Sequence, residues 1–370
     1  MLNSINSSLK WFLDRVALAE SLTERIGVLL VANVQGRTYP SDDYEEDSII
    51  SEFLTAAELD YLIEGFEKAG IYCETVIDEQ GFLDWLDKKR KNFPKPLPLV
   101  YNLAQNGTGP ARLSLIPGLC RLFGLPIVDS DAYGVAIARH KFHYMVLLRQ
   151  LRLPAVRSWW FTRQGWYPEE PPFGVRLIAK PTFESASIGI HKDSVFEMYI
   201  GVNKLLESRA AQYRQPLVIQ EFIRGFEIEV PVFDADGAQT IGAVGLAVNE
   251  KRNLNERFLT YDEVAFNQYS FYDFAAEFPA ATTKALTAAR KAFQGLGLKG
   301  VGRIDFRVQP NGSPVIIEVA CKPHLTKHSS FTFILDQIGK SNIDLLKFII
   351  GSAIERYDFE SSHATRIEYR

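Results

Sequence analysis

The chain has 370 residues and a formal net charge of −4, and its residues are 46% hydrophobic, 23% charged and 12% aromatic. This composition predicts a globular protein of two or three domains, and the small net charge gives no reason to expect a nucleic-acid or membrane-surface partner. No apolar run approaches the roughly 20 residues that span a bilayer, the three dispersed cysteines show no metal or redox spacing, and the start lacks a secretory pattern. We therefore expect a cytoplasmic protein without a membrane span.

The first third of the chain alternates between helical and strand patterns. After an amphipathic helix at residues 1–24, the expected elements are a strand at 25–33, a helix at 49–70, a strand at 71–77, a helix at 81–91, a strand at 97–103 and a helix at 113–123. This alternation predicts a parallel sheet that binds ligands at the carboxyl ends of its strands.

The rest of the chain carries the turn signals of antiparallel strands. A helix at 141–151 and a Pro-rich loop at 167–173 precede expected strands at 175–182, 217–223, 227–233 and 241–248, and then a helix at 284–296. Asp236-Gly237 marks a hairpin between the last two of these strands. An antiparallel region is therefore expected to follow the parallel one.

The most informative stretch is a hairpin at residues 301–320. Asn311-Gly312 suits a two-residue turn, because both residues accept positive φ. That turn places Asp305 directly opposite Glu318, with Ile316 on the same face as Glu318. Opposed like charges destabilise a sheet by up to about 1 kcal/mol, so a cation is expected to offset them, and Mg²⁺ binds through carboxylates together with substrate phosphates.

The charged face of this hairpin has two interpretations. Arg303, Asp305 and Arg307 share one face of the first strand, and Arg303 offers an anion-binding fork beside Asp305. The other face carries Ile304, Phe306 and Val308. The alternative is a solvated face on which the two arginines simply neutralise the acids. The hairpin alone does not separate them, and the rest of the chain decides.

Several features in the middle of the chain suit a polyphosphate nucleotide. Lys141 and Lys180 lie on different elements, and Ser185 and Ser187 belong to a small, hydroxyl-rich loop whose N–H groups can face phosphate. The strand-edge segment 220–223 can pair its backbone with an adenine edge. Glu227, further on, can accept from ribose hydroxyls.

Taken in order, these motifs resemble the ATP-grasp superfamily, most closely the D-alanine–D-alanine ligases, over roughly residues 25–350. The matching motifs are Leu122-Phe-Gly-Leu-Pro126, His140-Lys-Phe, Ile178-Ala-Lys-Pro, Ser185-Ala-Ser-Ile-Gly, Gln220-Glu-Phe-Ile-Arg-Gly-Phe-Glu, Phe271-Tyr-Asp-Phe, Gly302-Arg-Ile-Asp-Phe, Ile317-Glu-Val and Thr326-Lys-His-Ser.

The resemblance implies an α/β and α+β multidomain fold. It consists of an N-terminal parallel α/β domain on the substrate side (1–137) and two antiparallel-sheet subdomains that hold ATP between them (138–219 and 220–370).

The resemblance also implies a role for each matching residue. ATP would be bound by Lys141, Lys180, Ser185, Ser187, Gln220, Glu221, Ile223 and Glu227, and Mg²⁺ by Asp305 and Glu318. Arg303 would stabilise the tetrahedral state, and Ser185, in the loop that closes over the phosphates, would be a second catalytic residue. Small-molecule substrates would contact Glu45 or Glu46, Arg303, His324 and Ser329.

The chain departs from the family pattern at four places. Ala320 replaces an Asn that usually serves as a further metal ligand, and Lys322-Pro323-His324 replaces a Pro-Gly pair. The lid lysine and tyrosine that usually follow the segment at 271–274 are absent, and residues 102–110 replace a His-Gly-rich stretch. These departures argue against a housekeeping cell-wall ligase.

We therefore predict an ATP-dependent carbon–nitrogen ligase that joins an amino acid to a second small metabolite in specialised metabolism. The resemblance also implies a possible homodimer. A mycosporine-type amino acid ligase is one alternative, and a nucleotide-binding protein without ligase activity is another, motivated by Ala320. A structural subunit with merely superficial carboxylates is a third.

Overall fold

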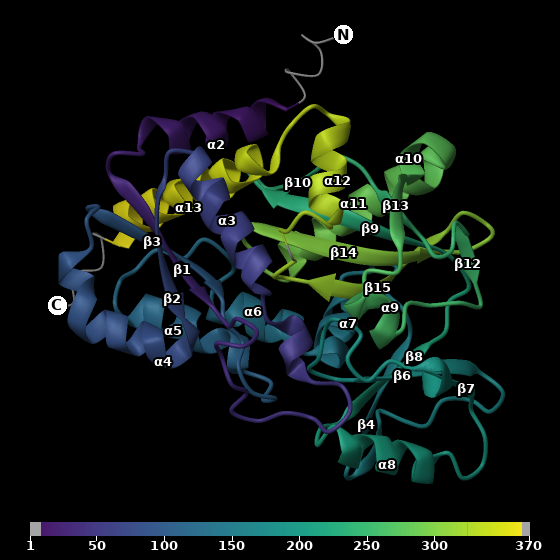
Figure 1. The fold of residues 1–370 in the computed structure, drawn as a ribbon. Helices are drawn as coiled ribbons and strands as arrows, with labels where there is room; N and C mark the ends of the chain where they lie inside the picture. Colours follow the sequence, from purple (N-terminus) through teal and green to yellow (C-terminus); the bar gives the residue numbers. More distant parts are fainter. Residues whose placement is uncertain (1–8, 324, 365–370) are drawn as a thin grey trace.

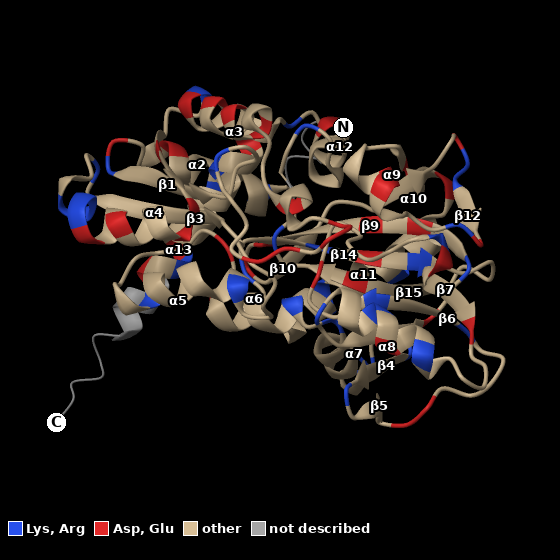
Figure 2. Cartoon of the chain, turned by 60° about the horizontal axis from the view of Figure 1, so that its bottom comes forward, with Lys and Arg blue, Asp and Glu red and all other residues tan. Residues whose placement is uncertain are grey.

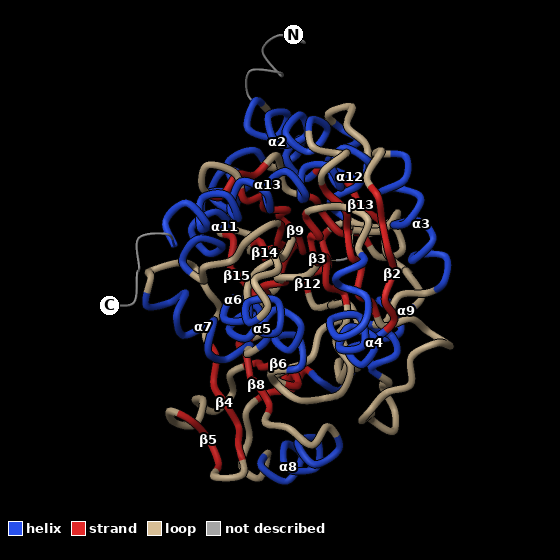
Figure 3. Tube along the Cα trace, turned by 90° about the vertical axis from the view of Figure 1, so that its left-hand side faces the viewer, coloured by secondary structure: helices blue, strands red, loops and turns tan. Residues whose placement is uncertain are grey.

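The N-terminal part of the protein is built on a small parallel sheet. The computed structural model describes residues 9–323 and 325–364. Its first sheet has the order β2-β1-β3, and both pairings are parallel, as predicted. The strands are β1 (Ile26–Ala32), β2 (Tyr72–Ile77) and β3 (Leu97–Leu103). All seven residues of β1 are buried, because the sheet is covered on both faces (Figures 1 and 3).

Helices from both ends of the chain cover this sheet. Its helices are α2 (Lys10–Ser21), α3 (Ala56–Lys68), α4 (Asp78–Asp84), α5 (Leu115–Leu122) and the C-terminal α13 (Asn342–Ala364). The rings of Phe12 on α2 and Phe348 on α13 stack with centroids 5.0 Å apart, so the first and last helices share one core (Figure 1).

The predicted helix at 49–70 is broken, and the break matters for the site. A short 3-10 helix covers Ile49–Glu52, and α3 starts only after Thr55, whose side chain forms a capping box with Glu58. The predicted helix at 81–91 likewise splits into α4, a π-helix (Trp85–Lys89) and a 3-10 turn (Arg90–Asn92). The helix at 113–123 begins as a 3-10 turn (Arg112–Ser114) before α5.

The middle of the chain forms an antiparallel sheet in the order β5-β4-β8-β6-β7. Its strands are β4 (Ser158–Thr162), β5 (Gly165–Tyr167), β6 (Arg176–Pro181), β7 (Val195–Glu197) and β8 (Leu217–Glu221), with α8 (Asn203–Gln212) packed on one face. Helices α6 (Ala132–Arg139) and α7 (Lys141–Gln150) lead into it, and only α7 was predicted. The expected domain boundary between residues 219 and 220 falls inside β8.

The largest sheet holds the predicted hairpin. Its main path is β13-β11-β9-β14-β15, and β10 and β12 also pair with β9. The strands are β9 (Gly225–Asp234), β10 (Ala238–Thr240), β11 (Val244–Ala247), β12 (Asn253–Asn255), β13 (Ser270–Asp273), β14 (Val301–Val308) and β15 (Pro314–Ala320). The helices of this region are α9 (Tyr261–Ala265), α10 (Phe274–Glu277), α11 (Pro279–Gly295) and α12 (Ser330–Gln337). An alanine-rich face of α11 packs on Ile304, Phe306 and Val308, which confirms the predicted apolar face of β14.

The turn of the hairpin differs from the prediction, although Asp305 does pair with Glu318. Gln309 and Ser313 flank a three-residue loop, and Gly312 takes its positive-φ position (φ 77°). This shifts the register by one residue near the turn, and an irregularity after Asp305 shifts it back. Ile316 therefore points into the core, and its predicted position on the face of Glu318 is wrong.

The charges of the molecule are mixed, as the composition suggested. Acidic and basic residues are interspersed over all three sheets and their helices (Figure 2). Over the part of the chain that the structure describes, no helix combines the length and apolar character that crossing a bilayer requires.

Candidate active site

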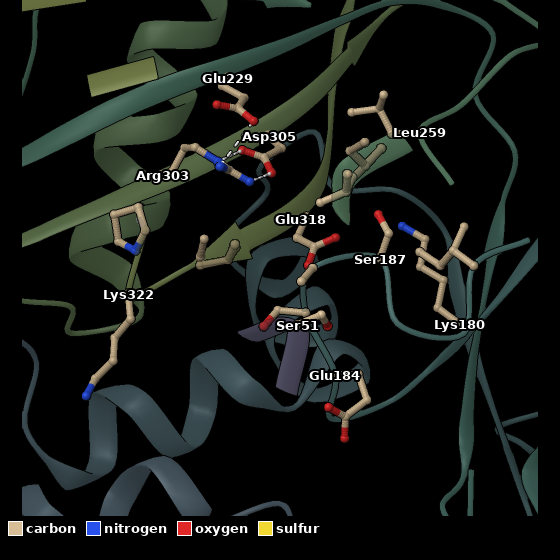
Figure 4. Close-up of a pocket in the computed structure, with 18 of the residues that line it drawn as sticks. Ser51, Lys180, Glu184, Ser187, Glu229, Leu259, Arg303, Asp305, Glu318 and Lys322 are labelled. Atoms are coloured by element: carbon tan, nitrogen blue, oxygen red, sulfur yellow. Dashed lines mark hydrogen bonds and ion pairs between the residues drawn. The ribbon is translucent and has the colours of Figure 1, made fainter. Parts of the chain in front are cut away.

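A cavity of about 520 Å³ lies where the middle and large sheets face each other, with one wall from the N-terminal part. Its lining includes most of the predicted site residues: Lys141, Lys180, Ser185, Ser187, Gln220, Glu221, Ile223, Glu227, Arg303, Asp305, Glu318 and Ser329. These residues lie on strands, on loops and at the start of α7, and the first and last of them are 188 positions apart in sequence, so the fold brings the predicted set together (Figure 4).

One end of the cavity holds two lysines beside a carboxylate. Lys141, at the start of α7, donates from Nζ to Glu318 Oε1 at 2.7 Å, and Lys180 at the end of β6 is buried nearby. Burial opposes ionisation of Glu318, but the charges of Lys141 and Lys180 lower its pKa to about 2. Burial also lowers the pKa of Lys180, against the attraction of Glu318. This end can therefore receive an anionic group.

The next part of the cavity is a row of three carboxylates across neighbouring strands. Asp305 on β14 pairs in register with Glu318 on β15 and with Glu229 on β9. Arg303 donates to both oxygens of Asp305 at 2.8 Å, and its Nη1 lies 3.1 Å from Glu229 Oε1 (Figure 4). Burial raises the pKa of Asp305 to about 7, although Arg303 opposes the rise. The sequence analysis missed Glu229, which the two-residue spacing from Glu227 could have indicated.

The donor set of Asp305 and Glu318 fits a hard divalent cation. Both side chains offer carboxylate oxygens on one face of adjacent strands, and repulsion between them would fall if a cation joined them. Among the side chains that the structure describes, those of residues 9–323 and 325–358, no group of three or more His, Cys, Asp or Glu is placed to hold a metal alone. Two carboxylates completed by phosphate oxygens is the arrangement that Mg²⁺ uses in nucleotide sites.

The opposite flank is the junction between the middle and large sheets. Gln220 is buried at the edge of the cavity, and its side-chain Nε2 has no partner among the described residues. Arg307 holds the junction by donating to the Ile223 carbonyl at 3.0 Å and to Glu227 Oε2 at 2.8 Å. The chain turns at Gly225 (φ 134°), where an added Cβ would lie 1.9 Å from the Val308 carbonyl oxygen. A free amide donor thus faces the cavity beside a fixed backbone edge.

A buried ionic cluster, which the sequence analysis did not predict, fixes the loop that carries Ser185. Glu52 accepts from Arg112 and Arg139 at 2.8 Å and from the Ser185 N–H at 3.0 Å. Glu184 accepts from the same two arginines, at 2.8 and 3.5 Å. The four charged side chains are at most 8% exposed. Burial opposes ionisation of Glu52, but the two guanidinium groups hold its pKa well below the usual range.

This cluster gives Ser185 a definite orientation. Its hydroxyl donates to Glu52 and accepts from Arg139 at 2.5 Å, so it faces the N-terminal part and anchors the loop there. Asp47 makes a second anchor, because it accepts from the Gly189 N–H at 2.9 Å and from the Tyr213 hydroxyl at 2.7 Å. The loop at 183–190 is therefore docked on the N-terminal part.

The structure does not bring Glu45 or Glu46 to the cavity. Both are exposed, and Glu46 accepts from Gln212 at 2.8 Å on the outer surface. The acid that faces inward is instead Glu52, which is buried at the end of the 3-10 helix Ile49–Glu52 that precedes α3. The expectation that either acid lines the substrate site is corrected on this point.

The remaining end of the cavity lies near α12. Ser329 is the N-cap of α12 and accepts from the Thr332 N–H at 3.2 Å. Lys322 points away from the cavity and donates to the Asn102 carbonyl at 2.7 Å (Figure 4). The predicted contact by His324 lies outside the described residues.

Comparison with known proteins identifies the family. The D-ala D-ala ligase C-terminus domain family matches residues 147–351, which is more than half of the chain. The chain belongs to the D-alanine–D-alanine ligase family. It is an ATP-dependent, ADP-forming carbon–nitrogen ligase with the ATP-grasp fold, as the sequence predicted.

Individual members of the family agree with this assignment. The D-alanine–D-alanine ligase of Acetivibrio thermocellus is 27% identical over 287 residues, covering 74% of this chain and 71% of that protein. The D-alanine–D-alanine ligase of Anaeromyxobacter sp. strain Fw109-5 is 27% identical over 260 residues, covering 64% of this chain and 74% of that protein. Among solved structures, the Bacillus anthracis ligase complexed with ATP aligns with a TM-score of 0.64 at 18% identity over 91% of this chain and 99% of its own. The VanG D-Ala:D-Ser ligase of Enterococcus faecalis aligns with a TM-score of 0.61 at 17% identity, over 89% of this chain and 99% of its own.

Proposed function

We propose that the cavity binds ATP with Mg²⁺ and that the protein joins the carboxylate of an amino acid to the amine of a second small metabolite. The observation that carries this proposal is the meeting of Lys141, Lys180, Asp305, Glu318 and Arg303 in one cavity. Catalysis of phosphoryl and acyl transfer consists mainly of positioning and charge neutralisation, which is what such a set supplies.

The nucleotide is proposed to lie between the middle and large sheets. Lys141 and Lys180 would contact the phosphates, and the unpartnered Gln220 amide would donate to the base. Ser187, Glu221, Ile223 and Glu227 would complete the site. Asp305 and Glu318 would hold Mg²⁺, which when bound supplies positive charge against the phosphate oxygens.

The proposed reaction has two steps. The γ-phosphoryl group moves from ATP to a carboxylate oxygen of the first substrate. The P–O bond between the γ-phosphorus and the bridging oxygen breaks, ADP leaves, and a new P–O bond makes the acyl phosphate. The amine nitrogen of the second substrate then attacks the carbonyl carbon, the C–N bond forms, and the C–O bond to phosphate breaks. Overall the ammonium group loses two protons, and the products are an amide, ADP and inorganic phosphate. Arg303 would stabilise the negative oxygen of the tetrahedral state.

Three features support a substrate pair other than two D-alanines. Ala320 stands where the family usually has Asn, the segment Lys322-Pro323-His324 replaces a Pro-Gly pair, and the buried Glu52 is already neutralised by Arg112 and Arg139. The metal-binding strand and the segment that follows it therefore differ from the family pattern. On these departures we propose that the reaction belongs to specialised metabolism.

The test is phosphate release from Mg-ATP with D-alanine alone and with pooled amino acids and amines, followed by mass spectrometry of the products. Amino-acid-dependent release with a condensed mass would support the proposal and identify both substrates. Hydroxylamine, which is largely neutral at about pH 7.5, should trap the acyl phosphate as a hydroxamate. Release that is independent of every added amino acid would contradict the proposal.

A further inference from the structure

Glu229 is the member of the carboxylate row that the reaction above leaves without a role. It is 6% exposed, it lines the cavity, and it belongs to the same face as Asp305. Its Oε1 is paired with Arg303, whereas its buried Oε2 has no hydrogen-bond partner among the described residues. A buried carboxylate oxygen without a donor is costly, so its position in a cavity points to a ligand that supplies one.

The charge around Glu229 indicates a cationic ligand. Arg303 supplies one positive charge for the carboxylates of Asp305 and Glu229, and its Nε and Nη2 donate to Asp305. The side chains that face Glu229 from the neighbouring segments are Tyr269 and His328. Burial, and then the charge of Glu229, raise the pKa of Tyr269 to about 12, and burial lowers the pKa of His328, so both are neutral at pH 7.

The part of the cavity around Glu229 lies beside the start of α12. The ring of His328 packs 4.9 Å from that of Phe271, and the ring of Phe331 on α12 lies 5.4 Å from that of Phe233 on β9. These contacts hold the N-terminus of α12, with its N-cap Ser329, next to the strand that carries Glu229. A small molecule with a cationic nitrogen toward Glu229 would therefore have Arg303 on one side and the helix N-terminus on another.

We propose that the free carboxylate oxygen of Glu229 binds the ammonium group of the second substrate, and that this contact makes the enzyme select an amine over an uncharged nucleophile. The inference rests on the proposed ligase reaction and names the class of its second substrate, a primary amine that is charged in solution. Because Arg303 is paired with the other oxygen of Glu229, the bound amine would lie next to Arg303, the residue that would stabilise the tetrahedral oxygen.

The test compares matched nucleophiles in the wild type and in Glu229→Gln. Gln keeps an oxygen for Arg303 but removes the negative charge. Each of a panel of amino acids, with D-alanine first, is paired with its 2-hydroxy acid, D-lactate in the first case. We expect kcat/KM for the amine to fall about 10- to 100-fold, as for loss of a hydrogen bond to a charged group. The value for the hydroxy acid, the KM for ATP and the yield of hydroxamate should change less than about threefold, because these do not involve the ammonium contact.

Two further variants distinguish this role from a merely structural one. Glu229→Asp keeps the charge and should recover part of the preference for the amine. Glu58→Gln removes another carboxylate that lines the cavity and should leave the amine-to-hydroxyl ratio unchanged.

The outcomes are separable. Equal decreases of kcat/KM for the amine and the hydroxy acid in Glu229→Gln would overturn the inference. A changed Mg²⁺ requirement with an unchanged ratio of amine to hydroxy-acid activity would also overturn it, because Glu229 would then be a metal ligand. A wild type that forms neither hydroxamate nor any condensed product would overturn the proposed function, and this inference with it.

Discussion

The buried cluster around Glu52 makes the sharpest prediction about how the enzyme is held together. Glu52→Gln retains the size of the side chain but leaves Arg112 and Arg139 with Glu184 as their remaining carboxylate. Removing one partner from a buried ionic group costs about 3–5 kcal/mol, because the others stay buried without compensation. We expect a lower thermal unfolding temperature.

The same substitution should weaken ATP binding. Glu52 accepts from both the N–H and the hydroxyl of Ser185, so its loss frees the loop that faces the phosphates. Small displacements of positioning groups have large kinetic effects, and we expect the KM for ATP to rise at least about tenfold. Steady-state kinetics with ATP as the varied substrate, together with calorimetric unfolding, measure the two effects.

The matched control is Glu46→Gln. Glu46 lies in the same segment and also contacts the middle part of the chain, through Gln212, but it is exposed, and exposed polar contacts contribute about 0–1 kcal/mol. A double-mutant cycle with Arg139→Met adds a second check, because residues in one ionic network couple. If Glu52→Gln behaved like Glu46→Gln, the reasoning would be refuted.

The contribution of Glu52 to the stability of the fold should also remain when the pH is lowered to about 5. Its pKa is depressed in the folded protein, so its contribution is fully present above the unfolded value of about 4.3 and is lost only as pH falls through the lower folded pKa. The difference between wild type and Glu52→Gln should therefore be constant from about pH 8 to pH 5. A difference that vanished near pH 6 would mean that another group carries the effect.

Three further predictions concern the site. Asp305→Asn should abolish product formation while ATP is still bound, as measured by phosphate release and by calorimetry; full turnover would exclude Asp305 as a metal ligand. Ala320→Asn adds an amide oxygen where the family usually has one, so the Mg²⁺ concentration for half-maximal activity should fall, and an unchanged titration would count against a metal at β15. His140 caps the helix that carries Lys141, and burial, followed by the charge of His143, lowers its pKa to about 4. Its stabilising effect is present above about pH 6.5 and is lost as pH falls toward 4, so His140→Asn, which caps without titrating, should flatten the decline of the unfolding temperature over that range.

The hairpin illustrates what sequence alone can predict. Alternation correctly predicted the buried face of β14 and the opposition of Asp305 to Glu318. The turn was wrong by one residue, and an irregularity after Asp305 compensated for it. Dipeptide signals identify that a hairpin exists, but the loop length and any bulge depend on how the strands twist and pack. Ile316 was therefore assigned to the wrong face.

The ionic cluster illustrates what sequence alone could not predict. Glu52 meets Arg112, Arg139 and Ser185, which are 60, 87 and 133 residues away along the chain. No local spacing relates them, since each lies on a different element, and only the docking of the elements creates the site. The family motif directed attention to Glu45 and Glu46, because their loop was expected to reach the substrate. The predicted helix is instead divided before Thr55, and Glu52 is buried at the end of the 3-10 helix that precedes the division.

The row of acids on β9, β14 and β15 links the stability of the fold to its chemistry. Glu229, Asp305 and Glu318 stand side by side, and the sheet tolerates them because Arg303 and Lys141 neutralise them. A phosphate that takes Lys141 would leave Glu318 buried without its cation, and the cost of that state is removed only if another cation arrives with the phosphate. The nucleotide and its divalent cation should therefore bind with positive, reciprocal coupling. The same reasoning explains why an acid row that would weaken an ordinary sheet is suited to this one.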